Sequence, residues 1–106
     1  MEQLEPVKVV RTNQPLKKSM DIDPEKYRED VRQLITDSVK FLVDDPASVD
    51  VTVYVGPKTT VYKVSCATGN LGQLIGSQGR TIMGLRAVVH AMTARAGIRS
   101  IIEIPV

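Results

Sequence analysis

The stretch Leu74-Ile75-Gly76-Ser77-Gln78-Gly79-Arg80-Thr81-Ile82 decides the fold. Its two glycines stand three residues apart, with a polar two-residue tip between them and apolar residues on either side. Glycines lack the Cβ atoms that would keep another backbone at a distance, and they permit unusual dihedral angles. The residues after Gly79 are expected to form a helix, whose first amides carry a partial positive charge suited to phosphate. The stretch therefore predicts a helix–loop–helix step whose loop grips a nucleic-acid backbone.

Residues 70–75 are expected to form a short helical turn before the loop, and a long amphipathic helix is predicted after it. The apolar positions of the long helix recur at spacings of three and four residues: Ile82, Leu85, Val89, Met92 and Ala96. Gly97 is its expected stop. A second stripe, formed by Gly84, Val88 and Ala91, is small and apolar. This stripe predicts a surface for close packing by another helix or a second subunit.

Alternating apolar residues upstream of the loop predict a β-hairpin. Residues 49–55 and 60–66 are the two strands, and residues 56–58 (Gly-Pro-Lys) form the turn. Tyr62 and Val64 are expected to face inward, and Lys63 outward. Residues 100–104 form a third strand. Because a helical crossover links it to the second strand, the two should lie parallel in one sheet.

A supporting helix is predicted to begin at Asp23-Pro24-Glu25 and to end near Asp44-Asp45, because Pro46 follows. Its apolar stripe consists of Tyr27, Val31, Leu34, Ile35, Val39 and Leu42. The order of elements predicts a two-layer α+β domain. It has a three-stranded mixed sheet, with one antiparallel hairpin and one parallel pair, and helices packed on one face. We expect this domain to span residues 23–106, and residues 1–22 to form a flexible N-terminal tail.

The 106 residues provide for one domain with one core. The formal net charge of +2 is unevenly distributed: +2 in residues 1–20, −4 in residues 21–46 and +4 in residues 47–106. A polyanionic partner is therefore favoured for the half that carries the loop. The single cysteine, Cys66, forms no internal disulfide, and no apolar run is long enough to span a membrane. A cytoplasmic protein without a membrane partner is expected.

The order of elements and the Ile-Gly-x-x-Gly-x-x-Ile step resemble a type II KH domain, and more closely the small single-domain bacterial KH proteins of the KhpA type. The similarity covers residues 24–104. It is carried by Asp45-Pro46, residues 71–80, Leu85-Arg86 and residues 97–104. The resemblance implies a narrow groove for single-stranded RNA, with the loop clamping about four nucleotides of backbone.

By this resemblance, the loop amides of Gly76, Ser77, Gln78 and Gly79 would meet phosphates. Arg80 and Arg86 would add charge, Ile75 and Ile82 would form an apolar floor under the bases, and Lys63 would lie on the opposite wall. Relatives commonly carry lysine where this chain has Ser77, so a lower and less salt-dependent affinity is expected. Replacing Gly76 and Gly79 together by aspartate is expected to abolish RNA binding and to leave the fold intact.

The resemblance also implies a role as an RNA chaperone or post-transcriptional regulator, with links to cell shape and cell-wall homeostasis in some relatives. It implies a homodimer, or pairing with a larger Jag (KhpB-type) KH partner. The alternatives are an assembly module associated with ribosomes or ribonucleoproteins, with little RNA affinity of its own, and a nucleotide-binding enzyme.

The enzyme is disfavoured because the glycine spacings match neither a P-loop nor a dinucleotide fingerprint, and because no acid–base or nucleophile pair can be assembled. His90, the single histidine, excludes a multi-histidine metal site and is expected to be an exposed helix residue. No small-molecule substrate, cofactor or metal is expected.

Overall fold

A computed structural model describes residues 22–105. The predicted tail, residues 1–22, lies outside this range except for Ile22. The first helix, α1 (Pro24–Leu42), begins as its sequence predicts: the Asp23 side chain accepts a hydrogen bond from the Glu25 amide, and Pro24 occupies the first turn. It ends before Asp44-Asp45, also as predicted.

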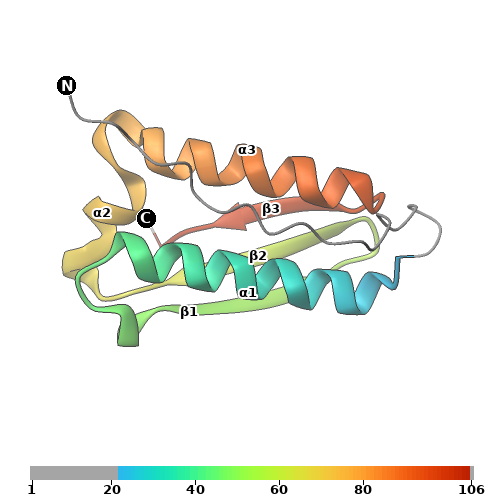
Figure 1. The fold of residues 1–106 in the computed structure, drawn as a ribbon, viewed down its shortest axis with the longest axis horizontal. Helices are drawn as coiled ribbons and strands as arrows, with labels where there is room; N and C mark the ends of the chain where they lie inside the picture. The colour runs from blue at the N-terminus through green and yellow to red at the C-terminus, as the bar shows by residue number, and fades with distance from the viewer. Residues whose placement is uncertain (1–21, 106) are drawn as a thin grey trace, which may run out of the picture.

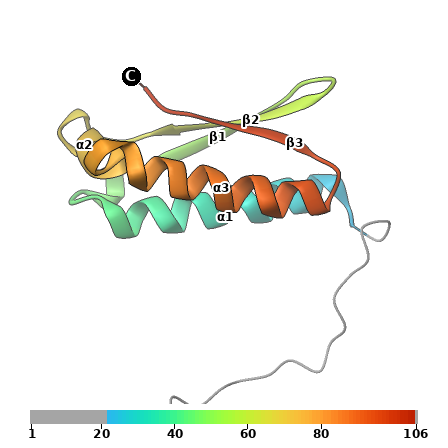
Figure 2. The ribbon, with the colours of Figure 1, turned by 90° about the horizontal axis from the view of Figure 1, so that it is seen from above.

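Three strands form one mixed sheet with the order β1-β2-β3. β1 (Asp50–Val55) pairs antiparallel with β2 (Thr59–Ser65), and β2 pairs parallel with β3 (Arg99–Glu103). The crossover between β2 and β3 contains α2 (Leu71–Ile75) and α3 (Arg80–Arg95). All three α-helices cover the same face of the sheet (Figures 1 and 2). The predicted two-layer α+β architecture is confirmed, and β1 and β3 are its edge strands.

The core lies between the sheet and the helices. Its fully or almost fully buried residues come from every layer: Val31, Ile35 and Val39 of α1, Val51, Tyr62, Val64 and Ile102 of the sheet, Leu74 of α2, and Ile82 and Val89 of α3. Two residues of the predicted apolar stripe of α1 are exposed: Leu34 is 41% exposed and Leu42, at the end of the helix, 38% exposed. The inward face of α1 is centred on the i, i+4 row through Ile35, so Thr36 is buried instead and satisfies its hydroxyl on the Arg32 carbonyl oxygen.

Side-chain hydrogen bonds fix the edge strand β3 to α3. The buried hydroxyls of Thr93 and Ser100 lie 2.7 Å apart, and Thr93 also donates to the Val89 carbonyl oxygen. Further along the strand, the Arg86 guanidinium donates to the Ile102 carbonyl oxygen at 3.1 Å. The separation between α3 and β3 is thus set by residues of both elements, which matters because a groove lies between them.

Tyr62 gives the domain a specific sensitivity to alkali. Its ring is fully buried in the central strand, and its hydroxyl donates to the Arg28 carbonyl oxygen. Burial raises the pKa of Tyr62 to about 12. The unfolded chain ionises this phenol near pH ~10 and the folded chain does not, so stability falls as pH rises from about 10 towards 12.

We expect the melting temperature in a circular dichroism titration to fall steeply over that pH interval and to fall less steeply in Tyr62→Phe. Tyr54→Phe, at an exposed tyrosine, is the matched control. Equal alkaline slopes for the wild type and Tyr62→Phe would contradict the assignment.

Candidate nucleic-acid interface

The Gly76–Gly79 loop has a backbone conformation that requires its first glycine. Gly76 lies at φ +79° and ψ 171°, a region open essentially only to glycine. A Cβ atom built at Gly76 would lie 2.9 Å from the Thr81 amide nitrogen, and nearer still to the Thr81 side chain. Any side chain here would push against the first turn of α3. The structure therefore corrects the expectation that Gly76→Asp leaves the fold intact.

The second glycine is under a weaker constraint. Gly79 is left-handed, at φ +73°, but a Cβ atom there would meet nothing within 4 Å. Gln78 is left-handed too, at φ +57°, which is uncommon for a residue other than glycine. Two consecutive left-handed residues turn the chain sharply out of α2 and into α3. The loop's shape is therefore built into the backbone of the isolated domain.

The loop presents amide groups that the protein leaves unused. The amides of Gly79 and Arg80 donate to the carbonyl oxygens of Gly76 and Ser77. Within the described residues, the amides of Ser77 and Gln78 have no acceptor, and no side chain caps the N-terminus of α3. These amides lie in the turn just before the 16-residue helix α3, whose N-terminal end carries partial positive charge, and such a position is favourable for an anion.

Arg80 and Arg86 stand at different positions along this surface. Arg80 is exposed beside the loop, and its guanidinium donates to the Gln78 side chain at 3.1 Å. Arg86 is half-buried further along α3, and one of its nitrogens is committed to the Ile102 carbonyl oxygen. Arg80 is exposed, and its guanidinium can reorient towards a phosphate at the loop. Arg86 is held in place by its hydrogen bond, and its remaining donors lie along the groove.

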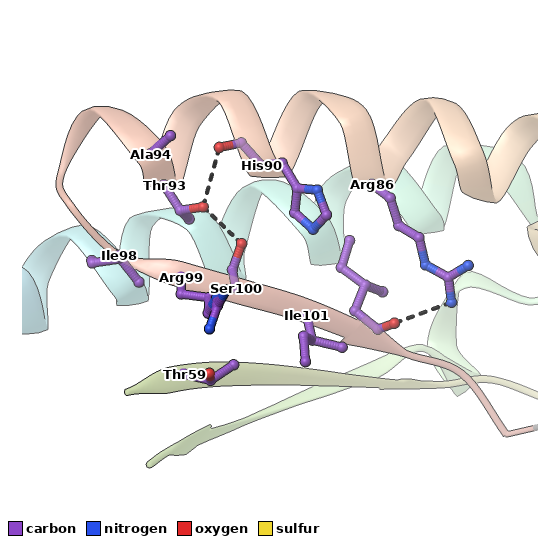
Figure 3. A pocket seen from close by; sticks show the side chains of 10 residues that line it. Thr59, Arg86, His90, Thr93, Ala94, Ile98, Arg99, Ser100 and Ile101 are labelled. Carbon is purple, nitrogen blue, oxygen red and sulfur yellow. Dashed lines mark hydrogen bonds between the residues drawn. The ribbon is translucent and has the colours of Figure 1, made fainter. Parts of the chain in front are cut away.

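A groove of about 560 Å³ runs between the second half of α3 and the first half of β3 (Figure 3). It is mostly apolar and carries cationic or titratable groups at its rim. Its lining comprises Thr59 of β2, Arg86, His90, Thr93 and Ala94 of α3, Ile98, and Arg99, Ser100, Ile101 and Ile102 of β3. In Figure 3 the His90 ring and the Arg86 side chain both extend from α3 towards β3. A mostly apolar floor with a few polar groups suits flat, partly polar rings such as nucleobases.

Three residues predicted for the groove, Lys63, Ile82 and Ile75, are not among the residues that line it. Lys63 is exposed in the central strand, between the buried Tyr62 and Val64, so it projects from the face of the sheet that the helices leave open. Ile82 is only 4% exposed and belongs to the core. Ile75 is half-buried beside the loop and retains some accessible surface.

His90 and the residues of β3 line the groove, although the sequence did not predict them there. The wall opposite α3 is β3, from Arg99 to Ile102, because β3 and not β2 is the edge strand on this side. The predicted pairings, an antiparallel hairpin and a parallel second pair, already make β2 the central strand, and the structure confirms this order. His90 is exposed, as predicted, yet it lines the groove.

The match to a known family covers the loop and both walls of the groove. A family model described as "KhpA/KhpB, KH domain" matches residues 32–104. The chain belongs to the KhpA/KhpB KH-domain family. The predicted resemblance is confirmed, and the observed sheet is that of a type II KH domain.

Curated relatives from distant bacteria agree with this assignment. The chain is 31% identical over 74 residues to "RNA-binding protein KhpA" of Chlamydia trachomatis, which covers 70% of this chain and 95% of that protein. The protein of the same name from Clostridium acetobutylicum is 31% identical, covering 70% of this chain and 99% of that protein. The Aquifex aeolicus relative of that name is 34% identical, with 70% and 94% coverage.

The described part of the KH domain holds neither a metal cluster nor a membrane-spanning helix. Within residues 22–105, no three histidine, cysteine, aspartate or glutamate side chains come together as a metal site would require. None of the helices that the structure describes is both long and apolar enough to cross a membrane.

Proposed function

We propose that this KH domain binds single-stranded RNA without catalysing a reaction, gripping the backbone at the Gly76–Gly79 loop and seating bases in the groove between α3 and β3. The observation that carries the proposal is the pair of unused amides at Ser77 and Gln78, in the turn just before the N-terminus of α3, which no side chain caps. The names of the curated relatives support RNA as the ligand.

The roles of the individual residues follow from where they stand. The amides of Ser77 and Gln78 donate to the phosphate, and Arg80 adds charge next to it. Further along, Arg86 and His90 border the bases, and Ile101 and Ile102 provide apolar surface from the opposite wall. Single-stranded RNA fits this arrangement because unpaired bases can lie flat on such a floor, whereas paired bases cannot reach it.

Ser77 makes the loop's grip modest. The first variable position of the loop is an exposed hydroxyl, so Arg80 is the cation next to the amides. Each phosphate neutralised by a side chain contributes about −0.7 to the slope of log affinity against log salt for a single strand. A grip that uses amides in place of a second cation therefore lowers that slope as well as the affinity.

The proposal is tested by fluorescence-polarisation titration of a labelled ten-nucleotide single-stranded RNA against the wild type and Gly79→Asp. Loss of binding in the variant supports the loop as the clamp. Equal affinities would contradict it.

A second role, as a self-association module, is favoured by the outer face of α3. This face is uncharged and exposed over more than two turns: Met83, Gly84, Ala87, Val88, Ala91 and Ala94. Met83 is 64% exposed and Val88 53% exposed. The predicted stripe of Gly84, Val88 and Ala91 lies within it. Pairing through this face would place two RNA-binding loops in one particle and raise a weak affinity by avidity. We propose the same face for a homodimer and for a larger Jag (KhpB-type) KH partner.

We expect Val88→Arg to shift the protein to monomer in sedimentation velocity, because a charge in an apolar contact must be desolvated without a partner. Phe41→Arg is the matched control, since Phe41 is 91% exposed on α1. It adds the same charge at another exposed apolar position and is expected to leave the dimer fraction unchanged. A wild type that remains monomeric at millimolar concentration would contradict the proposed pairing.

An RNA chaperone or post-transcriptional regulator needs this combination of modest affinity and more than one site per particle. Acceleration of strand annealing by the wild type, and its loss in Val88→Arg at matched fold stability, is the measurement for that role.

A further inference from the structure

The face of the sheet that the helices leave open carries an apolar row across all three strands. Tyr54 of β1 is the register partner of Val61 of β2, and Val61 is the register partner of Ile101 of β3. The three side chains share the open face because the adjacent residues Val53, Tyr62 and Ile102 lie in the core or pack against it on the other side. Tyr54 is 54% exposed and Ile101 50% exposed. The aromatic ring of Tyr54 thus lies on the open face of the sheet, and its strand β1 is two strand spacings, about 10 Å, from β3.

Charge divides this open face into two ends. At the end nearest the β1–β2 turn, Arg99 lies beside Thr59 in register, and Lys58 is exposed in the turn itself. Neither acidic residue of the open face, Asp50 or Glu103, lies at that end. At the opposite end, Lys63 is the register partner of Glu103, so its charge is offset there. The turn end therefore combines an aromatic ring with two cations, a combination typical of surfaces that bind single-stranded nucleic acid.

The turn end is continuous with the groove. Thr59, Arg99 and Ile101 line the groove between α3 and β3, and the same three residues stand in the outward positions of their strands. The groove thus opens around the edge of β3 onto the open face, with no acidic side chain among its lining residues. A single-stranded nucleic acid that leaves the groove past Arg99 would contact Ile101, then Val61 and then the ring of Tyr54.

We propose that this surface, Tyr54, Lys58, Val61, Arg99 and Ile101, is a second binding site for single-stranded nucleic acid, taking the nucleotides that extend beyond the groove. Tyr54 stacks on a base, and Lys58 and Arg99 meet phosphates. This inference rests on the proposed RNA-binding function and extends it from the groove to the opposite face of the sheet.

The test compares labelled oligouridylates of four and ten nucleotides, titrated against the full chain. We expect Tyr54→Ala to weaken the ten-nucleotide affinity about fivefold or more and the four-nucleotide affinity less than about twofold, because stacking on one base is lost. Tyr54→Phe keeps the ring and is expected to bind like the wild type. Phe41→Ala removes an exposed ring from α1 and is expected to change neither affinity.

Two lysine variants, one at each end of the open face, test the proposed route of the nucleic acid across it. Lys58→Ala is expected to reduce the magnitude of the salt slope for the ten-nucleotide ligand by about 0.7, the contribution of one phosphate contact on a single strand. Lys63→Ala, on the same face beside Glu103, is expected to leave that slope unchanged. Equal effects of the two variants would contradict the path proposed here.

The outcomes separate this inference from the function on which it rests. If Gly79→Asp abolishes binding of both ligands while Tyr54→Ala changes neither, the second site is wrong and the proposed function stands. If Tyr54→Ala weakens both ligands equally, the residue acts through the groove, and the second site is wrong. If Tyr54→Ala leaves RNA binding unchanged but dissociates the dimer, the face is a protein-docking surface, and the inference is likewise wrong.

Discussion

Gly79→Asp is expected to weaken binding of single-stranded RNA by about 30-fold or more. The aspartate would place a carboxylate beside the Ser77 and Gln78 amides, where the proposed phosphate lies. Repulsion and loss of charge-assisted hydrogen bonds together amount to ~2 kcal/mol, which is about 30-fold in affinity. The fold is expected to tolerate the change, because a Cβ atom at Gly79 meets nothing within 4 Å and aspartate adopts left-handed dihedrals more readily than most residues.

Gly79→Asn is the matched control. Asparagine makes the same demand on the backbone and has nearly the same shape, but it carries no charge. It is expected to keep most of the affinity in a polarisation titration, and both variants should melt within a few degrees of each other. A Gly79→Asp protein that binds as tightly as Gly79→Asn would show that the loop does not hold a phosphate.

Gly76→Ala is expected to destabilise the domain by ~3 kcal/mol, even though it adds a single methyl group. The dihedrals of Gly76 alone cost a residue with a side chain ~1–3 kcal/mol. The new methyl also overlaps Thr81, so the start of α3 must shift. For a domain of this size, such a loss lowers the melting temperature by about 10 °C or more.

Gly72→Ala provides the contrast for that measurement. Gly72 lies within α2 with open space where its Cβ would be, so alanine is expected to leave stability unchanged or to raise it by ~0.5–1 kcal/mol. Thermal unfolding followed by circular dichroism distinguishes the two. Equal melting temperatures for Gly76→Ala and the wild type would mean that the loop relaxes freely around a side chain at this position.

The secondary-structure elements and their arrangement in two layers could be predicted from the sequence. The cap at Asp23, the alternation in residues 49–55 and the period of the long helix are local patterns, and each corresponds to an element in the structure. The crossover connection then required a parallel pair, because right-handed crossovers join parallel strands. The loop was also found locally, since two glycines around a polar tip are a strong conformational signal.

The walls of the groove could not be predicted from the sequence with the same success. Lys63 was placed on the wall opposite the loop by resemblance alone, whereas β3 is the strand at that edge of the sheet. The predicted hairpin and parallel pair already made β2 the central strand, so the misplacement of Lys63 came from the resemblance and not from a missing signal in the sequence. The prediction that Leu34 is buried was wrong because a helical stripe shows only which residues are apolar. The element that packs against the helix decides which part of the stripe is covered.

The tight connection between α3 and β3 affects where on a long RNA molecule the protein could bind. It contains three residues, 96–98, and folds back on the helix end, with the Ile98 amide bonded to the Thr93 carbonyl oxygen and the Gly97 amide to that of Ala94. It therefore does not arch over the groove. An RNA bound as proposed passes through without needing a free end, so internal unpaired stretches of a transcript are as accessible as its termini. One transcript then accommodates as many copies of the protein as its unpaired length allows.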